Sequence, residues 1–247
     1  MFTATMPGSA RLRRVGSGSK LCRCLARCGS RRWSPMPSLY NAGISACENG
    51  RQWQRALSLL SEMLGSKLEP TVISYTAGIR ACEKSQQWQR ALLLLSEMLG
   101  SKLEPDVISY NAGISACEKS QQWQRALLLF SEMLGSKLEP DMLGSKLEPD
   151  VISYNAGISA CEKSQQWQRA LSLLSEMLGS KLEPDVISYT AGISACEKGR
   201  QWQRALLLFS EMLGSKLEPD VISYNAGISA CEKTRCHQLQ RWDRRVQ

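Results

Sequence analysis

Apolar residues recur along this chain at two helical spacings in turn. Within residues 72–106, a first group falls at i, i+4 and i+7: Tyr75, Ile79 and Cys82. A second group falls at i, i+3, i+4, i+7 and i+10: Trp88, Ala91, Leu92, Leu95 and Met98. Each spacing puts its residues on one face of a helix. The pattern therefore predicts two helices that fold into a hairpin and pack through their apolar faces.

Residues around these two helices indicate where each helix begins and ends. Ser85 is placed to cap the N-terminus of the second helix, and Gly100 stands where a C-terminal glycine cap is expected. Pro105 prevents the second helix from continuing, and Asp106 lies just before the next helix. Gly78 costs the first helix about 1 kcal/mol relative to alanine. We expect close packing between helices to require that glycine.

The hairpin pattern recurs with a 35-residue period. Its copies span residues 37–71, 72–106, 107–141, 151–185 and 186–220, and a partial sixth copy spans 221–233. Fixed-period repetition is typical of a solenoid, in which each unit buries its apolar face by stacking on its neighbours. The sequence therefore predicts an all-α solenoid of paired antiparallel helices.

Residues 142–150 duplicate residues 133–141 letter for letter. The duplication lengthens the connection after the third copy, which costs on the order of 1 kcal/mol in closure entropy. We expect the array to fold with the insertion 142–150 as a bulged loop. Asp150 then directly precedes the fourth copy, where Asp141 would otherwise stand. A bulge that spread the third and fourth copies apart would split whatever surface they share.

Cysteine, tyrosine and tryptophan each keep one slot through successive copies. Because these slots lie on apolar faces, we expect these residues to pack in the core and the aromatic rings not to stack on bases. We also expect no disulfides, because packed helices lie about 9–10 Å apart, which is too far for a disulfide. Unpaired thiols are typical of a reducing compartment. The residues concerned are Cys47, Cys82, Cys117, Cys161, Cys196 and Cys231; Tyr40, Tyr75, Tyr110, Tyr154, Tyr189 and Tyr224; and Trp53, Trp88, Trp123, Trp167 and Trp202.

The net charge of +8 comes from the two ends of the chain. Residues 1–36 hold eight basic and no acidic residues, and the tail 234–247 adds +3, so the repeats carry −3. Global charge therefore gives no support for RNA binding by the repeats. The first segment is typical of an organelle transit peptide, mitochondrial or plastid, with a disordered basic arm as the alternative. No apolar run is long enough to span a membrane.

Candidate chemistry at the two ends is weak. Cys22, Cys24 and Cys28 match no standard zinc spacing and have no fourth ligand nearby. The histidine His237 has no accompanying acid or nucleophile, and no H-x-E…C-x-x-C deaminase pattern occurs. We therefore expect no enzyme activity, no metal and no cofactor.

The first helix of each copy also carries a polar stripe. In the third copy Asn111, Ser115 and Lys119 lie at i, i+4 and i+8, on one face, and stacked copies would set these stripes side by side. The first stripe position alternates between an amide and a hydroxyl, which differ in hydrogen-bonding pattern. Its residues are Asn41, Thr76, Asn111, Asn155, Thr190 and Asn225.

The repeats resemble those of pentatricopeptide repeat proteins. They share the 35-residue period, the Tyr-Asn/Thr opening of the first helix, the Ala-Leu-x-Leu-Leu/Phe-x-Glu-Met second helix and the closing Pro-Asp. The resemblance covers residues 37–233. It implies a right-handed solenoid that binds single-stranded RNA through its first helices, one base per repeat, in organellar RNA processing, stability or translation. We expect a monomer.

The resemblance also implies roles for individual residues. The fifth and last residues of a repeat select the base: Thr76 with Asp106, Asn111 with Asp150 or Asp141, Asn155 with Asp185, and Thr190 with Asp220. A hydrophobic second residue clamps the base: Ile73, Ile108, Ile152 and Ile187. A lysine lies near the phosphates: Lys84, Lys119, Lys163 and Lys198. Threonine with aspartate favours G and asparagine with aspartate favours U, so the implied core target is GUUG.

Two other functions compete with RNA binding. Paired-helix solenoids also serve as protein-interaction scaffolds, and a glutamate beside each stripe lysine favours that role. The duplication and the degenerate sixth copy are compatible with a truncated repeat copy of little function. The first copy departs from the family pattern with Ser38 at the clamp, Asn49 at the lysine slot and Thr71 as its last residue, so we expect it to read poorly.

Overall fold

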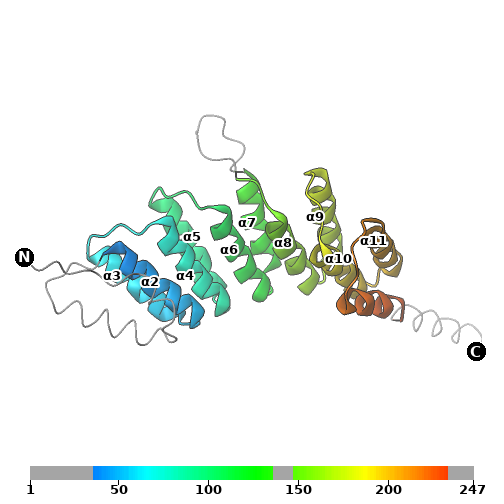
Figure 1. Cartoon of the computed structure of the whole chain (residues 1–247), viewed down its shortest axis with the longest axis horizontal. Helices are drawn as coiled ribbons and strands as arrows, with labels where there is room; N and C mark the ends of the chain where they lie inside the picture. Colours follow the sequence, from blue (N-terminus) through cyan, green and yellow to red (C-terminus); the bar gives the residue numbers. More distant parts are fainter. Residues whose placement is uncertain (1–35, 136–146, 233–247) are drawn as a thin grey trace, which may run out of the picture.

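The computed structural model describes residues 36–135 and 147–232 (Figure 1). These residues form helices with short connections between them. In chain order the helices are α2 (Pro37–Asn49), α3 (Trp53–Gly65), α4 (Val72–Lys84), α5 (Trp88–Gly100), α6 (Val107–Lys119), α7 (Trp123–Gly135), α8 (Val151–Lys163), α9 (Trp167–Gly179), α10 (Val186–Lys198) and α11 (Trp202–Gly214). Residues 221–232 form a further helical segment.

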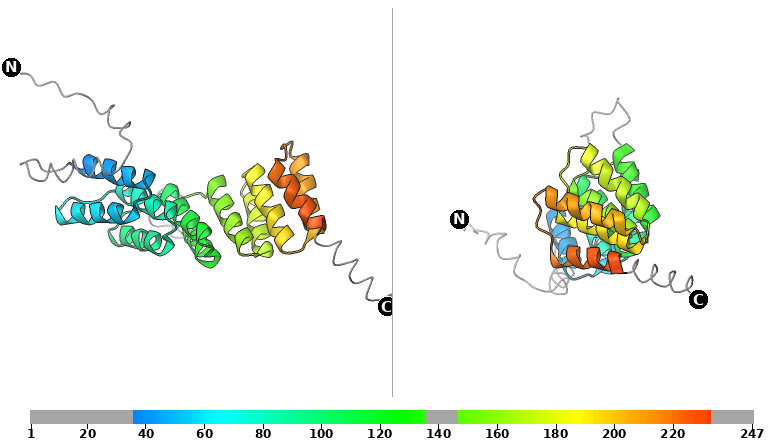
Figure 2. Two further views of the ribbon diagram at one scale, coloured as in Figure 1. Left: turned by 90° about the horizontal axis from the view of Figure 1, so that it is seen from below. Right: turned by 90° about the vertical axis from the view of Figure 1, so that its right-hand side faces the viewer.

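Helices pair into hairpins, and the hairpins stand side by side in an elongated row (Figures 1 and 2). Each first helix packs on its own second helix and on the first helix of the next copy. Each second helix from α3 to α9 also contacts the next first helix. The predicted fold class, an all-α solenoid of helix pairs, is confirmed.

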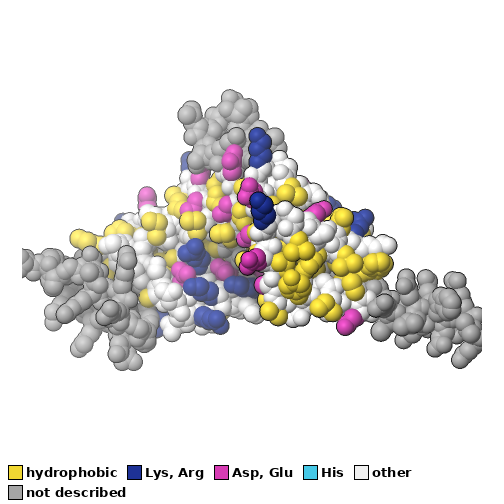
Figure 3. Space-filling model, turned by 45° about the vertical axis from the view of Figure 1, so that its right-hand side comes forward, with side chains coloured by type: hydrophobic (Ala, Val, Ile, Leu, Met, Phe, Trp, Pro, Cys, Tyr) yellow, Lys and Arg dark blue, Asp and Glu magenta, His cyan; other side chains and the backbone are white. Residues whose placement is uncertain are grey.

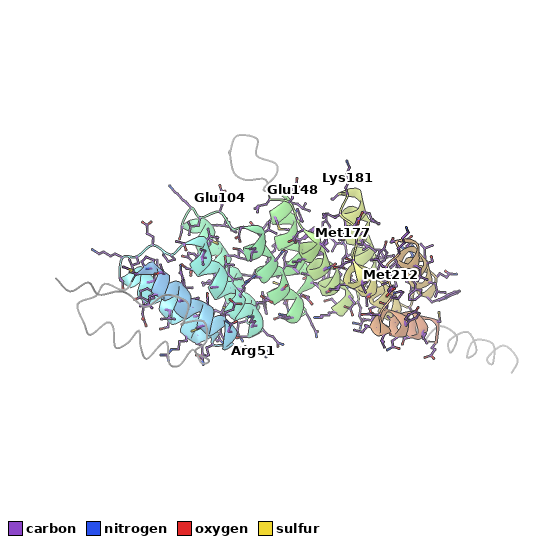
Figure 4. The ribbon with its side chains drawn as sticks, viewed as in Figure 1. Arg51, Glu104, Glu148, Met177, Lys181 and Met212 are labelled. Atoms are coloured by element: carbon purple, nitrogen blue, oxygen red, sulfur yellow. The ribbon has the colours of Figure 1, made fainter. Side chains whose placement is uncertain are left out.

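A continuous core runs through the row between the two layers of helices. Its recurring members are the predicted tyrosine and cysteine slots together with a methionine of each second helix, such as Tyr75, Cys82 and Met98. Figure 4 shows Met177 and Met212 within α9 and α11, and both are fully buried. The exceptions lie in the partial copy, where Tyr224 is 49% exposed and Cys231 is half-buried.

The tryptophans lie at the edge of the core. Trp53, Trp88, Trp123, Trp167 and Trp202 are half-buried and pack against the core cluster. Trp167 lies against the backbone of Gly199 in the next hairpin, and the guanidinium of Arg204 stands 4.8 Å from the Trp167 ring centroid. The packing role predicted for these tryptophans holds, with less burial than the tyrosines have.

The predicted helix caps at Ser85 and Gly100 were wrong. Ser85 ends α4, and its hydroxyl donates to the carbonyl of Arg51 in the preceding turn at 3.1 Å, while Gln87 precedes α5. Gly100 is the last residue of α5 and has ordinary helical backbone, since no described glycine has a positive φ. The sequence spacing therefore predicted where both turns lie but predicted the wrong cap residue in each.

A non-glycine residue takes the left-handed conformation in each turn that the structure describes. After α5 this residue is Lys102, with φ 56°, and the N–H of Leu103 donates to the carbonyl of Met98 at 3.1 Å while that of Lys102 donates to Leu99 at 3.0 Å. These two bonds form the Schellman motif, which satisfies the last carbonyls of the helix. Gln86 takes the same place after α4, with φ 57°. Arg51, in the equivalent turn after α2, lies at the opposite edge of the array from Glu104 and Glu148 (Figure 4).

The close packing predicted at Gly78 is confirmed. A Cβ atom at Gly78 would lie 2.8 Å from Leu60 Cδ1, in the preceding hairpin, and 3.2 Å from Leu94 Cδ1. Gly113 is tighter still, with Leu95 Cδ1 at 2.6 Å. A glycine at this position lets two second helices pack closely against one first helix. The stabilisation from this packing exceeds the cost of glycine's low helix propensity.

The stacking continues past the duplicated segment. Helix α7 ends at Gly135 and α8 begins at Val151, yet α8 packs on α6 as the other first helices pack on one another. The third and fourth copies therefore stay in register, and the splitting considered from the sequence does not occur. Asp141, the segments 1–35 and 233–247, and the cysteines and histidine in them lie outside the described residues.

Candidate nucleic-acid interface

The closing aspartate of one copy caps the first helix of the next. Oδ1 of Asp106 accepts a hydrogen bond from the backbone N–H of Ser109 at 2.8 Å. Asp150 with Ser153 and Asp185 with Ser188 repeat this bond at 2.8 Å. An N-cap carboxylate satisfies an N–H of the first helical turn that has no partner within the helix. Capping therefore fixes the position of each carboxylate at the junction between two copies.

The asparagines at the fifth position bond directly to these carboxylates. Nδ2 of Asn155 donates to both oxygens of Asp185, at 3.1 and 3.3 Å. Oδ1 of Asn155 accepts from the hydroxyl of Ser188 at 2.5 Å. The amide thus has its donor end on the aspartate and its acceptor end on the serine, so its orientation is fixed before any ligand arrives.

The threonines at the fifth position reach the carboxylate through the serine. Oγ1 of Thr190 lies 2.6 Å from Oγ of Ser223, which donates to Asp220 at 2.7 Å. Oγ1 of Thr76 lies 2.7 Å from Oγ of Ser109, and that hydroxyl donates to Asp106 at 2.6 Å. The two residue types therefore present different hydrogen-bonding groups from the same framework.

The pairing also holds across the duplicated segment. Nδ2 of Asn111 donates to Oδ1 of Asp150 at 3.1 Å, and Ser153 donates to Oδ1 of Asn111 at 2.6 Å. This arrangement matches that of Asn155, with the same amide-to-carboxylate distance. Of the two aspartates considered from the sequence, the structure sets Asp150 against Asn111.

The pKa of Asp150 lies below its ordinary value. Partial burial acts to raise the pKa, and hydrogen bonds from the backbone and side chain of Ser153 and from Asn111 outweigh it. The pKa of Asp220 is also lowered, mainly by its hydrogen bonds from Ser223. Both groups are therefore carboxylates at neutral pH and offer acceptor oxygens.

A serine that sequence reasoning passed over links these residues. Ser74, Ser109, Ser153, Ser188 and Ser223 stand two positions before the fifth residue and are fully buried. Ser153 and Ser188 complete capping boxes with Asp150 and Asp185. The spacing of an N-cap residue followed by serine three positions later was the signal that could have identified them.

The proposed clamping isoleucines are exposed at equivalent points of the row. Ile73, Ile108, Ile152 and Ile187 are between 49% and 66% exposed. Their neighbours on the first helices, such as Ile79 and Ile114, are fully buried. Each of these isoleucines lies three positions before the polar fifth residue of its copy. An exposed apolar side chain at this point provides a surface against which the ring of a base can pack.

Each predicted phosphate-side lysine pairs with a glutamate of the preceding copy. Nζ to Oε1 distances are 2.8 Å for Lys84–Glu48, 2.7 Å for Lys119–Glu83, 2.8 Å for Lys163–Glu118 and 2.6 Å for Lys198–Glu162. In the sequence each of these lysines is adjacent to a glutamate of its own copy, whereas each ion pair joins a lysine to the glutamate of the preceding copy. Figure 3 shows basic and acidic side chains close together over the middle of the array.

The first copy differs as its sequence indicated. Asn41 accepts from Ser74 at 2.6 Å, but the N-cap residue is Thr71, so no carboxylate completes the group. In the last copy Asn225 is exposed, and no closing residue is described. Four complete groups, at Thr76, Asn111, Asn155 and Thr190, thus lie in one row.

Comparison with protein families agrees with this arrangement. Models of the pentatricopeptide repeat domain match residues 38–85 and 93–164, those of the PPR repeat family match 149–198 and 184–233, and a single PPR repeat matches 73–103. The chain belongs to the pentatricopeptide repeat family. A search of curated proteins gave no significant match.

Solved structures of this family have the same fold. The pentatricopeptide repeat protein PPR10 from maize superposes with a TM-score of 0.64 at 22% identity, over 88% of this chain and 30% of PPR10. PPR10 in complex with an 18-nt psaJ RNA element gives 0.62 at 22% identity, over 90% and 35%. The PPR domain of Arabidopsis thaliana protein-only RNase P 1, in complex with tRNA, gives 0.67 at 12% identity, over 80% and 100%. The chain thus spans about a third of the length of PPR10.

No cluster of potential metal ligands occurs in residues 36–135 or 147–232. Over the same ranges, no helix combines the length and apolarity that crossing a bilayer requires.

Proposed function

We propose that this protein binds single-stranded RNA along the row of its first helices, one base to each complete group. The groups pair a fifth residue with a capping aspartate, in the order Thr76, Asn111, Asn155 and Thr190. The resemblance to the family implies GUUG as the bound core. Its role would be to mask, stabilise or remodel a transcript.

The observation that carries this proposal is the repeated geometry of the asparagine–aspartate pair. Asn111 and Asn155 meet their aspartates at the same distance of 3.1 Å although the intervening chain differs in length. A polar side chain of fixed orientation beside an exposed isoleucine combines hydrogen-bonding groups with an apolar ring contact. Such a combination can read the edge of an unpaired base while its face is stacked.

The direct test is fluorescence anisotropy of residues 37–247 with labelled RNAs that contain GUUG or a scrambled core. The proposal predicts that GUUG binds about tenfold or more tightly, from base contacts of ~1–3 kcal/mol each. Ile108→Ala and Ile152→Ala should weaken binding, whereas Ser96→Ala, on the exposed face of α5, should not. Equal binding to both RNAs would overturn the proposal of base-by-base reading.

A protein-interaction scaffold is the second candidate function. The observation that favours it is the neutralisation of the four stripe lysines by glutamates. A surface with balanced charge offers little long-range attraction to a polyanion. If no RNA binds at physiological salt while a protein partner binds the row of exposed isoleucines, the scaffold function replaces RNA binding.

We propose further that the protein acts in an organelle, mitochondrion or plastid. Residues 1–36 hold eight basic residues and no acidic one, a composition typical of transit peptides. Fusion of residues 1–36 to a fluorescent protein should direct it to one of these organelles. Diffuse fluorescence would contradict this proposal and leave the RNA-binding proposal untouched.

A further inference from the structure

A ladder of ion pairs ties successive first helices together. Within residues 36–135 and 147–232 its rungs are Glu48–Lys84, Glu83–Lys119, Glu118–Lys163 and Glu162–Lys198, with Nζ to Oε1 distances between 2.6 and 2.8 Å. The third rung spans the duplicated segment and is as short as the others. We call these four pairs the glutamate–lysine ladder.

The two partners of each rung differ in exposure. The glutamate side chains are between 14% and 19% exposed, and the lysine side chains are between 35% and 39% exposed. Each glutamate is thus held mostly within the helix layer, and each lysine reaches over it into solvent. A phosphate that approaches from solvent meets the ammonium group first and the carboxylate directly behind it.

The lysines of the ladder stand on the same helices as the base-selecting residues. Lys119 follows Asn111 by eight positions on α6, and Lys163 follows Asn155 by eight on α8. Eight positions along a helix advance the chain by about 12 Å and turn it about 80° away from the starting direction. Each copy therefore places one cation at the C-terminal end of the helix that carries its polar group, about two turns further along, and each of these cations already has an anionic partner.

We propose that Glu48, Glu83, Glu118 and Glu162 determine how strongly this surface holds RNA phosphates, by competing with the phosphates for the lysines. The inference rests on the proposed RNA-binding function and names the residues that set its electrostatic component. A phosphate that takes a lysine leaves a largely buried carboxylate without its partner. Replacing the carboxylate by a phosphate at the lysine therefore gains little free energy, and the protein binds the RNA phosphate backbone weakly.

Weak backbone binding has a consequence for selectivity. Phosphate contacts hold any sequence equally, while base contacts distinguish sequences. With its lysines neutralised, the array binds an RNA only where several base groups are matched at once. The protein has four complete base-selecting groups. The ladder thus weakens its binding to transcripts that do not match these groups.

The ladder predicts a specific salt dependence. Binding of single-stranded nucleic acid gives a slope of log K against log salt of about −0.7 for each phosphate neutralised. In the wild-type protein the rungs contribute little to this slope, because the carboxylate released by a phosphate takes up a cation. A variant with Glu48→Gln, Glu83→Gln, Glu118→Gln and Glu162→Gln should steepen the slope by up to about 3, for four freed lysines.

A control variant of equal charge separates the ladder from net charge. Glu62→Gln, Glu97→Gln, Glu132→Gln and Glu176→Gln change four acidic residues of the second helices, away from the lysines. The ladder variant should bind GUUG and scrambled RNA more tightly by the same factor, about tenfold or more at low salt. The control should stay near wild type. Adding Lys84→Gln, Lys119→Gln, Lys163→Gln and Lys198→Gln to the ladder variant should restore the wild-type slope.

Each outcome decides between the two inferences. Equal slopes in the ladder and control variants, both folded by circular dichroism, would overturn the competition and leave selective binding intact. A wild-type protein that binds GUUG no better than the scrambled RNA overturns the proposed function, whatever the slopes. A steeper slope that persists after the four lysines are replaced would also overturn the ladder, because the added attraction would then come from other cations.

Discussion

The side-chain amide of Asn111 donates to the carboxylate of Asp150 at 3.1 Å, although the two residues stand 39 positions apart. The equivalent pair Asn155–Asp185 has the same distance over 30 positions. The duplicated segment therefore lengthens the chain between the partners without moving them. Stacking of α8 on α6 and the capping of α8 by Asp150 fix this geometry.

Deletion of residues 142–150 should leave RNA preference unchanged. It restores a connection of the length found at residues 101–106, so the loop-closure cost falls by about 1 kcal/mol and the melting temperature rises slightly. Asp141 would then stand where Asp150 stands now. Anisotropy and thermal unfolding of the deletion variant check both parts; a changed base preference would show that the loop takes part in reading.

Gly113→Ala and Gly100→Ala should have different effects on stability. Both replace a helical glycine and gain up to about 1 kcal/mol in helix propensity. At Gly113 the new Cβ meets Leu95 Cδ1 at 2.6 Å, whereas nothing lies within 4 Å at Gly100. Overpacking costs about 1–3 kcal/mol, so urea unfolding should rank Gly100→Ala above wild type and well above Gly113→Ala. Equal free energies of unfolding for the two variants would refute the packing role.

Lys102→Gly should stabilise the array. Lys102 has φ 56°, in the left-handed region that costs a non-glycine residue about 1 kcal/mol. Glycine adopts this conformation freely and keeps the Schellman bonds, which use only backbone atoms. Ser101→Gly is the matched control, because Ser101 has φ −82° and gains nothing from glycine. A lower melting temperature for Lys102→Gly than for Ser101→Gly would contradict the account of this turn.

Ser188→Ala should destabilise the protein and weaken base selection at Asn155. The buried hydroxyl of Ser188 donates its one proton to Oδ1 of Asn155 and lies 2.9 Å from Oδ1 of Asp185, and its loss leaves a polar atom without its partner at a cost of about 1–3 kcal/mol. Ser175→Ala, on the exposed face of α9, serves as the control. Unfolding and competition between RNAs that differ at that base measure the two effects. Unaltered discrimination in a folded Ser188→Ala protein would show that the serine has no part in orienting the amide.

Acid should remove the stabilisation supplied by Asp150. Its pKa is lowered in the folded protein, so this contribution is complete above the unfolded value of about 3.9 and is lost as the pH falls through the folded value. Asparagine still caps a helix but does not titrate. The difference in melting temperature between wild type and Asp150→Asn should therefore shrink as the pH falls below about 4. A difference that stays constant over this range would contradict the role of the charged form.

The sequence was sufficient for the helix pairs, the core columns and the register of the repeats, because these depend on apolar spacing within each copy. Its periodicity could not show that Ser153 links Asn111 to Asp150, since that contact joins separate copies. The glutamate partners of the lysines were missed for the same reason: Glu83 is adjacent to Lys84 in the chain but pairs with Lys119. The turns were misassigned because Lys102 and Gln86, residues with no special preference for positive φ, occupy the places usually taken by glycine.

The most direct test of base reading is a change of preference by one substitution. Thr190→Asn converts the last complete group to the type found at Asn155, so the variant should prefer an RNA with U at one end of the core. GUUG reads the same in both directions, and competition among GUUG, GUUU and UUUG would also give the polarity of the bound strand. The Thr190→Asn variant should bind one of the other two RNAs more tightly than it binds GUUG. A variant that still prefers GUUG, or binds all three equally, would contradict base selection by these groups.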